Sequence, residues 1–513
     1  MVRLFALIFW VLFCLRANSQ GGFKSQYKTP LSYNNSAKAV FETNSGDYVL
    51  CGIVVDTINN YLTNKLSILG LNNQGQVQWV KKYGTKKFEY LDNQFISKWF
   101  YRQGDYIYYS GCVRDSNNVQ LGVFIKFNLN GDTIWQKKFY DSAFDVIPQG
   151  VSSSIDGGFL ITGFFQDINS RQCLIIKTDL NGNEQWRKKI PKAIPNVQDG
   201  KQILQDSITK KIVIIGYQYV GNANSWSNLD NILVCDSLGN KLSQTSLSGQ
   251  SGGLLIDMVQ TKDKKIVAVG TTIYPQTLGG SNMTKSYVLK FDINSPASFI
   301  WRINDFDTLS LNNFFTGIIE KPNGDFILGG VIEREHKKNL PDNCLNRLTW
   351  ITPTGVVKNN RTYQYSNNTN ADYVQLAQTI THGSNGSILA ALQLYNTSPN
   401  PFFMVRYDST GCDSSAFYCQ TLGIGTYESL SYSVNIYPNP TESILYLKPQ
   451  TTICNIAILI YNASGEKVIE KKINCIGPNI PVEILLKNLN NGIYFVQIFS
   501  DGALIKKEKI LKE

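Results

Sequence analysis

Three stretches decide the fold: "SILGLNNQGQVQWVKKY" (67–83), "VFIKFNLNGDTIWQKKF" (123–139) and "LIIKTDLNGNEQWRKKI" (174–190). They align without gaps. Each begins as a β-rich apolar run and reaches an Asn/Asp/Gly turn, where glycine or asparagine can adopt positive φ. A second run follows and opens on Trp. The pattern predicts a β-hairpin that recurs along the chain.

Later copies of the hairpin depart from this pattern. The copy at 232–244 keeps the glycine but has Ser243 in place of Trp, and the copy at 287–301 keeps Trp301 without the glycine. The copy at 348–360 keeps only the turn, and 403–412 ends the series.

A second short run precedes each hairpin and usually ends in glycine. These glycines fall at positions 52, 111, 163, 216, 270 and 330, at intervals of 52 to 60 residues. The runs are nearly all apolar, which indicates strands buried on both faces and therefore stacked sheets. Units of this length with about four strands are typical of β-propeller blades. We therefore expect an all-β chain with a seven-bladed propeller over residues 20–420, closed by residues 22–29 as a last outer strand.

The Gly-x-x-x-Trp element of the hairpins resembles the tryptophan-docking motif of pyrroloquinoline-quinone-type propellers. It occurs at Gly75/Trp79, Gly131/Trp135 and Gly182/Trp186, and Trp301 keeps the aromatic position. The resemblance implies that these four Trp side chains pack between blades; the alternative is a set of sugar-stacking platforms. The quinone cofactor does not carry over, because the chain lacks the adjacent cysteines of that family. We expect no cofactor.

From Val434 the pattern changes to alternating strands. The segment opens with "VNIYPNPTESILYLK" (434–448), where Pro438 and Pro440 cannot donate to a sheet ladder and Asn439 suits a tight turn. Hairpin turns are predicted at Ser464-Gly465 and Asn491-Gly492. A length near 80 residues predicts a small, immunoglobulin-like β-sandwich at 434–513, after a linker at 421–433.

This segment resembles the C-terminal sorting domain of type IX secretion system cargo. The resemblance rests on motifs in a fixed order, which include "YPNP", "IYNASGEKV" (460–468), "LNNGIYFVQI" (489–498) and a final basic strand. The matching residues are Tyr437, Pro438, Asn439, Pro440, Gly465, Leu489, Gly492, Tyr494 and Lys507. It implies a Gram-negative host, contact with outer-membrane secretion and sorting machinery, and release or attachment at the cell surface. An ordinary adhesive sandwich is the alternative.

The N-terminal stretch "MVRLFALIFWVLFCLRANS" (1–19) has the features of a secretory signal peptide. Arg3 precedes an apolar run that is too short to span a bilayer, and small residues precede a predicted cleavage between Ser19 and Gln20. No other segment is long and apolar enough for a transmembrane helix. Because export permits disulfides, Cys412 with Cys419 and Cys454 with Cys475 are possible pairs. Cys51, Cys173 and Cys235 lie in apolar runs and are expected in the core.

Motifs of known chemistry are scarce. The chain has two histidines, His336 and His382, and no nucleophile-elbow, metalloprotease, phosphate-binding or calcium-loop pattern. We predict no catalytic or metal site. Asp47, Asp105 and Asp325 recur at one repeat position and are expected to be turn residues.

Two insertions, 219–228 and 336–346, break the period, and Trp226 in the first is the candidate ligand contact. The formal net charge of +10 is mild over 513 residues. It includes recurring Lys-Lys pairs such as Lys81-Lys82, expected to be solvated strand ends or an anionic-glycan surface. Nucleic acid is not an expected partner of an exported protein. We expect a non-catalytic surface module that binds a glycan or an envelope or matrix protein, or else a secreted hydrolase acting on carbohydrate.

Overall fold

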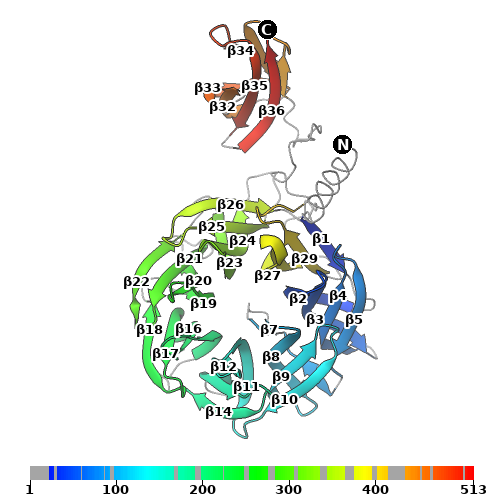
Figure 1. The fold of residues 1–513 in the computed structure, drawn as a ribbon, viewed down its shortest axis with the longest axis vertical. Helices are drawn as coiled ribbons and strands as arrows, with labels where there is room; N and C mark the ends of the chain where they lie inside the picture. The colour runs from blue at the N-terminus through cyan, green and yellow to red at the C-terminus, as the bar shows by residue number, and fades with distance from the viewer. Residues whose placement is uncertain are drawn as a thin grey trace, which may run out of the picture. The chain divides into compact units, whose positions relative to one another are not determined.

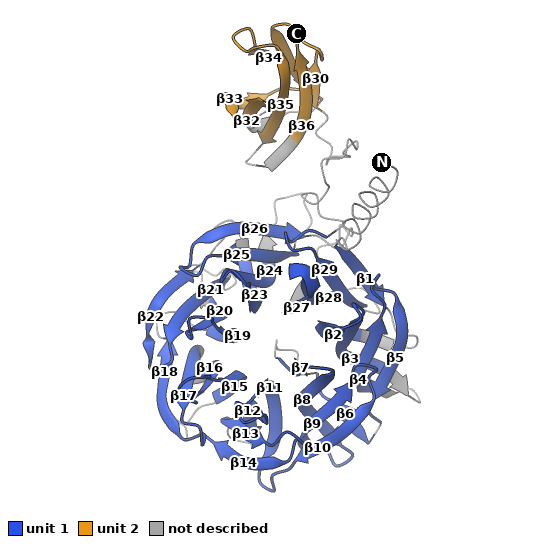
Figure 2. Ribbon diagram, viewed as in Figure 1, with its two compact units in different colours: residues 1–420 blue, residues 421–513 orange. Residues whose placement is uncertain are grey.

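The computed structural model of the chain divides into two compact units, residues 1–420 and 421–513 (Figure 2). The structure describes residues 22–27, 32–58, 61–85, 87–92, 98–166, 171–190, 198–222, 225–247, 253–274, 283–304, 310–334, 344–363, 375–394, 401–413, 434–450, 453–462, 466–500 and 503–513.

Over the described residues, unit 1 forms seven antiparallel sheets, which we number in chain order. The first sheet contains β2 (Ser32–Glu42), β3 (Tyr48–Ile58), β4 (Tyr61–Leu71) and β5 (Val77–Tyr83), and the second contains β6 (Phe88–Tyr90), β7 (Phe100–Gln103), β8 (Tyr106–Asp115), β9 (Gln120–Asn128) and β10 (Thr133–Phe139). The third sheet contains β11 (Asp145–Ser153), β12 (Phe159–Gln166), β13 (Arg171–Thr178) and β14 (Glu184–Lys189). The fourth contains β15 (Gln198–Gln205), β16 (Ile212–Asn222), β17 (Ser225–Cys235) and β18 (Lys241–Leu247). The fifth sheet contains β19 (Gly253–Gln260), β20 (Ile266–Tyr274), β21 (Met283–Asp292) and β22 (Ser295–Asn304), and the sixth contains β23 (Ser310–Glu320), β24 (Phe326–Arg334), β25 (Cys344–Ile351) and β26 (Val357–Tyr363). The seventh sheet contains β27 (Gln375–His382), β28 (Ile388–Leu394) and β29 (Phe402–Tyr407), with β1 (Phe23–Tyr27) at its edge. The 3-10 turn η1 (Ser384–Gly386) joins β27 to β28.

These sheets stand around a ring, with the first strand of each sheet toward the centre and the fourth on the outside (Figure 1). Seven hydrophobic clusters fill the spaces between them, and each cluster joins residues from two sheets that are neighbours in this order. The strand β12 illustrates the cause: residues 159–165 are buried without interruption, because both faces are covered. The predicted face-to-face stacking is confirmed.

The ring closes through the N-terminal strand. β1 pairs antiparallel with β29, from Phe23 opposite Arg406 to Tyr27 opposite Phe402. The seventh sheet therefore takes its outer strand from the other end of the unit. The predicted closure is confirmed for residues 23–27.

Unit 2 is a sandwich of two sheets. One contains β30 (Val434–Tyr437), β31 (Ile444–Pro449) and β34 (Val482–Leu485); the other contains β32 (Ile453–Asn462), β33 (Lys467–Ile476), β35 (Gly492–Ser500) and β36 (Ala503–Lys512). One apolar cluster, which includes Leu447, Ile458 and Val496, lies between them. A propeller followed by a small sandwich, the predicted fold class, is confirmed.

The hairpin predicted at Asn491-Gly492 is wrong. β34 pairs with β31, whereas β35 pairs with β32 and β36, so the connection crosses from one sheet to the other. Leu486 is fully buried and Leu489 packs against the same core. Leu486 and Leu489 therefore do not end a hairpin strand. They anchor the crossing segment to the core.

Candidate functional site

The innermost strands share a β-bulge that the repeat did not reveal. In β2, β11, β15, β19, β23 and β27 the register with the second strand shifts by one residue at the same place. A bulge leaves one residue without a cross-strand partner and redirects its side chain. The bulged residues are Lys38, Gln149, Lys201, Ile256, Thr316 and Gln378. In the second sheet, two short strands, β6 and β7, replace the single inner strand.

An ion pair links sheets on different sides of the ring. Lys98, which precedes β7 in the second sheet, contacts Asp257 of β19 in the fifth sheet, with 2.7 Å between Nζ and Oδ1. Asp257 is fully buried, and its oxygens also accept hydrogen bonds from the backbone N–H groups of Met258 (2.7 Å) and Ile318 (3.0 Å). The segment before β7 and the strand β19, which two complete sheets separate in the ring order, are thereby linked.

Other bulged side chains also contact neighbouring inner segments. Lys38 pairs with Asp92 at 2.9 Å, and its ammonium group lies 5.1 Å from the ring centre of Trp99. Lys201 donates to Gln149 Oε1 at 2.6 Å and is buried, and burial lowers the pKa of Lys201 to about 8. These contacts, with Lys98–Asp257, form what we call the axial cluster.

A second polar group lies in register across the fourth sheet. Asp199, Tyr217 and Asp230 stand opposite one another on β15, β16 and β17, and the Tyr217 hydroxyl donates to Asp199 Oδ2 at 2.7 Å. Burial raises the pKa of Asp199. Burial also raises the pKa of Asp230 to about 8, so this carboxyl holds a proton at neutral pH.

The arrangement limits the chemistry that these groups can perform. Hydrolysis of a glycoside needs two carboxyl groups that face one substrate-filled space. In the axial cluster, Asp92 and Asp257 are instead paired with lysines of the chain itself. No group of three metal-ligating side chains occurs among the described residues. Burial raises the pKa of the Cys112 and Cys235 thiols to about 12, which makes them poor nucleophiles.

The four predicted docking tryptophans each lie against a turn of the next sheet. A Cβ placed on Gly131 would lie 2.9 Å from Trp79, one on Gly182 2.5 Å from Trp135, one on Gly239 2.7 Å from Trp186, and one on Gly355 2.9 Å from Trp301. The Trp301 indole N–H also donates to Pro353 O at 3.0 Å. Each contact runs from the outer strand of one sheet to the third-to-fourth-strand turn of the following sheet.

Two further aromatic residues dock in the same way, although the motif did not identify them. Phe23 of β1 lies 2.3 Å from the Cβ position of Gly75, and Trp350 of β25 lies 2.3 Å from that of Gly411. Trp350 lies in the third strand of its sheet, before the turn glycine, so it does not fit the Gly-x-x-x-Trp spacing. The sixth copy keeps only the turn of the motif, with Asn359 at the Trp position, and Trp350 supplies the docking ring from a different strand.

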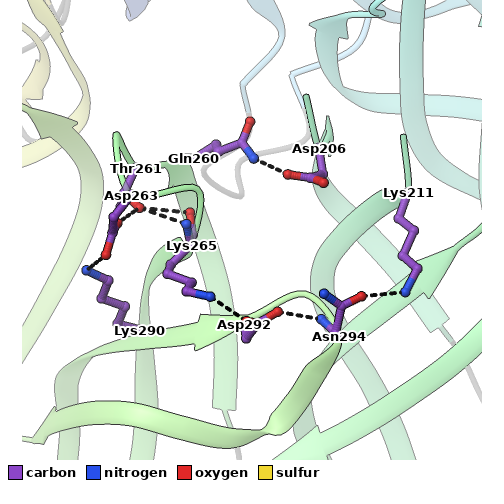
Figure 3. Close-up of polar contacts among 9 residues, drawn as sticks. All are labelled: Asp206, Lys211, Gln260, Thr261, Asp263, Lys265, Lys290, Asp292 and Asn294. Carbon is purple, nitrogen blue, oxygen red and sulfur yellow. Dashed lines mark hydrogen bonds and ion pairs between the residues drawn. The ribbon is translucent and has the colours of Figure 1, made fainter. Parts of the chain in front are cut away.

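At the junction of the fourth and fifth sheets the Trp and the glycine are lost together. Ser243 replaces the Trp, and the facing turn carries Asp292 and Asn294 without a glycine. Polar contacts occupy this region (Figure 3). Lys211 donates to Asn294 at 2.6 Å, and Gln260 donates to Asp206. The Trp and the glycine are lost together because the aromatic ring packs on a turn residue that has no side chain.

The first lysine of each recurring pair also spans a junction. Lys137 donates to Asn183 at 2.8 Å, Lys188 donates to Asn240 at 3.2 Å, and Lys81 pairs with Asp132. In each case the acceptor follows the glycine on which the Trp docks. The pairs thus add a polar contact between sheets to the solvated role expected of them.

The remaining predicted residues either lie outside the described part of the chain or make no contact that assigns them to a site. Trp226 lies in β17 opposite Gly221, but its side chain is outside the described residues, as are His336, Ser19, Gln20, Gly465 and Cys419. His382 is exposed at the end of β27. Cys51, Cys173 and Cys235 are buried and free, as expected. Cys412 and Cys475 are disulfide-bonded, and Cys454 stands opposite Cys475 in the β32–β33 register. The two predicted pairings stay predictions.

In unit 2, the "YPNP" stretch is tied to the last strand. The Asn439 side chain donates to Lys509 O at 2.8 Å and accepts from the Leu511 N–H at 3.0 Å. Thr441 continues the contact through backbone hydrogen bonds with Leu511 and Glu513. Tyr494 is buried in β35 and its hydroxyl donates to Asn490 O. Pro438 and Pro440 are exposed beside Asn439, and Gly492 and Lys507 lie in β35 and β36.

Comparison with known proteins agrees with this description of unit 2. Residues 435–513 match the family model of the secretion system C-terminal sorting domain. No curated protein matches the chain.

Solved structures resemble the chain at low identity. A protein of unknown function from Dyadobacter fermentans is 10% identical (TM-score 0.41, covering 75% of this chain and 98% of that one). The β-propeller domain of the Trilobed protease from Pyrococcus furiosus is 12% identical (TM-score 0.34, 74% and 96%). An α-L-arabinofuranosidase from Fusarium graminearum is 8% identical (TM-score 0.40, 76% and 98%). At this level of similarity none of them identifies an activity.

The sorting domain identifies the chain as cargo of a type IX secretion system. Such cargo interacts with that system's machinery and is exported to the cell surface or secreted. Among the described residues, no helix has the length and apolar character needed to cross a bilayer.

Proposed function

We propose that the exported propeller is a non-catalytic module that binds a glycan or an envelope or matrix protein outside the cell. The observation that carries the proposal is the Lys98–Asp257 pair at the centre of the ring. A catalytic carboxyl group must reach its substrate, whereas Asp257 is buried and its oxygens accept from one ammonium and two backbone N–H groups. Its role is to hold inner strands in place.

The ligand is proposed to bind at the end of the ring where second strands meet third strands. Both insertions that break the repeat, 219–228 and 336–346, fall at such connections, between β16 and β17 and between β24 and β25. Connections that lengthen beyond a repeat commonly carry binding residues, because the rigid sheets position them. Trp226 is the proposed contact, since an aromatic ring can stack on a sugar or fill a protein pocket.

The remaining assignments belong to the same proposal. Residues 1–19 are the signal peptide, cleaved between Ser19 and Gln20, in a Gram-negative host. Residues 20–420 are the propeller domain, 421–433 the linker, and 434–513 the sorting domain.

The test is a glycan array together with a panel of chromogenic glycosides, applied to the purified exported protein. We expect binding without turnover, and a loss of binding in Trp226→Ala. Turnover that disappears with a single Asp or Glu substitution would overturn the proposal. Binding that Trp226→Ala leaves unchanged would remove this residue from the site.

A carbohydrate hydrolase is the second candidate, and one observation favours it. Burial raises the pKa of Asp230 to about 8, in the direction that a general acid needs, and for Asp230 to act as that acid its buried carboxyl group would have to become accessible to the substrate. If Asp230 were that acid, Asp230→Asn would abolish glycoside turnover while the protein stayed folded. In a binding module, the same substitution leaves glycan or protein binding intact.

A further inference from the structure

Four large apolar side chains protrude from turns at one end of the third and fourth sheets. Ile155 and Ile208 lie in the turns that join first to second strands, and Leu180 and Leu238 lie in the turns that join third to fourth strands. Their exposed fractions are 43%, 63%, 53% and 61%, respectively. We call these four residues the turn patch. In antiparallel sheets both kinds of turn fall at the same end of the ring.

The turns of the patch are held together. Gln205 Oε1, at the base of the fourth sheet's first turn, accepts from the Ile155 N–H at 3.0 Å and from Ser154 Oγ at 2.8 Å. Gln205 Nε2 in turn donates to the carbonyl oxygen of Lys210 at 2.9 Å. In the outer turns, Trp186 of the third sheet docks on Gly239, the neighbour of Leu238. The patch is therefore carried by a fixed framework.

The repeat shows that nothing in the fold requires these side chains. The corresponding exposed turn positions of other sheets are Asn44, Asn73, Lys262, Pro322, Pro353, Ser384 and Ser409. Apolar residues in the outer turns of other sheets are isolated or covered: Ile293 is buried, Leu129 packs against the core, and Val356 of the sixth sheet is exposed without an exposed apolar neighbour in the first turn of its sheet other than Pro322. Exposed apolar residues clustered in two adjacent sheets are typical of an interaction surface.

The charge beside the patch is positive. Lys210, Lys262 and Lys264 are exposed in the turns of the fourth and fifth sheets at this end. The nearby carboxylates have partners within the chain: Asp263 pairs with Lys290, Asp292 pairs with Lys265, and Asp206 accepts from Gln260 (Figure 3). Asp156 pairs with Lys177. The charges of Asp263, Asp292 and Asp156 are compensated by these ion pairs. Asp206 has a neutral partner, and in the outer turns Asp179 and Asp236 accept from Asn183 and Asn240, with Lys137 and Lys188 nearby. Lys210, Lys262 and Lys264 add three exposed ammonium groups beside the patch.

We propose that the turn patch, flanked by Lys210, Lys262 and Lys264, docks the exported protein on an anionic lipid surface. Apolar side chains at turn tips can enter the headgroup boundary while basic residues beside them meet lipid phosphates. This function is separate from the ligand binding proposed above, because it uses the opposite ends of the same strands.

Co-sedimentation of the purified exported protein with vesicles tests the proposal. One set of vesicles contains phosphatidylglycerol and phosphatidylcholine, and the other contains phosphatidylcholine alone. The patch variant is Ile208→Ser with Leu238→Ser. The matched control is Ile134→Ser with Ile300→Ser, because these residues of β10 and β22 are 50% and 52% exposed but lie on outer strands. A charge variant carries Lys210→Glu with Lys264→Glu.

We expect binding to the anionic vesicles only, weakened at least about tenfold in the patch variant. The control should bind like the unsubstituted protein, and the charge variant about fivefold more weakly or worse for each lysine at low salt. Absence of binding to anionic vesicles overturns the proposal, as does an equal loss in the patch and control variants. A concentration-dependent dimer in light scattering that the patch variant abolishes would assign the patch to a second copy instead, and would also overturn it.

Discussion

Gly182→Ala tests whether docking of a tryptophan on a turn stabilises the ring. Gly182 has a φ of +75° in the β13–β14 turn, and an added Cβ would lie 2.5 Å from Cη2 of Trp135 in the preceding sheet. The matched control is Gly157→Ala in the β11–β12 turn of the same sheet. Gly157 has a φ of +88°, and a Cβ there would meet nothing within 4 Å.

The two substitutions share a backbone cost and differ in the contact. An L-residue with left-handed φ costs about 1–2 kcal/mol in either turn. At Gly182 the indole must also retreat by about 1 Å to restore an ordinary carbon–carbon separation. Such overpacking costs about 1–3 kcal/mol more. We therefore expect Gly182→Ala to lower the free energy of unfolding by about 1–3 kcal/mol beyond Gly157→Ala.

Urea unfolding of the exported protein, followed by far-UV circular dichroism, measures the difference through the transition midpoints. A double-mutant cycle with Trp135→Ala completes the design. Once the indole is gone, Gly182→Ala should cost no more than Gly157→Ala, because only the backbone cost remains. Equal losses for the two glycine variants in the presence of Trp135 would refute the idea that the contact between sheets is close-packed.

Three further predictions follow from the closing strand, a buried carboxyl group and the sorting domain. Deleting residues 20–30 should sharply lower the melting temperature, because β29 loses its partner; an unchanged melt would contradict closure by β1. The pKa of Asp230 is raised to about 8, so its contribution to the free energy of unfolding is complete below pH about 4 and is lost as pH rises toward 8. Asp230→Asn should therefore flatten the fall of the urea midpoint between pH 5 and 8.5. Equal slopes of midpoint against pH in the two proteins would contradict this. Deleting residues 434–513 should leave a folded propeller in the periplasm, while residues 421–513 behind a signal peptide should export a reporter only in a type IX-competent host; export of the truncated protein would disprove the assignment.

The hairpins could be predicted because their determinants are local. An Asn/Asp-x-x-Gly turn between β-rich runs specifies the reversal, and uninterrupted apolar runs specify burial on both faces. Cys51 and Cys173 were placed in the core on the same grounds. The tail could be predicted because several motifs recur in a fixed order.

The candidate site could not be predicted, because its contacts are not local. A bulge inserts one residue into an apolar strand and leaves the pattern intact, so Lys38 and Lys201 gave no signal. Lys98 and Asp257 are 159 positions apart in a chain whose period says nothing about pairs across the ring. Asn439 was expected to serve its own turn, but its side chain bonds to a strand about seventy residues later.

Because β1 pairs with β29, the ring can close only after almost the whole propeller has been synthesised. The first strand has no partner until residues 402–407 have been made, nearly four hundred positions later, so a chain that stops early cannot seal its ring. The sorting domain lies beyond that point, at residues 435–513. Truncation anywhere in the propeller thus removes the seal and the export address together. For chains that end early, the order of parts therefore couples closure of the ring to export: a C-terminal truncation within the propeller loses β29 and the sorting domain together.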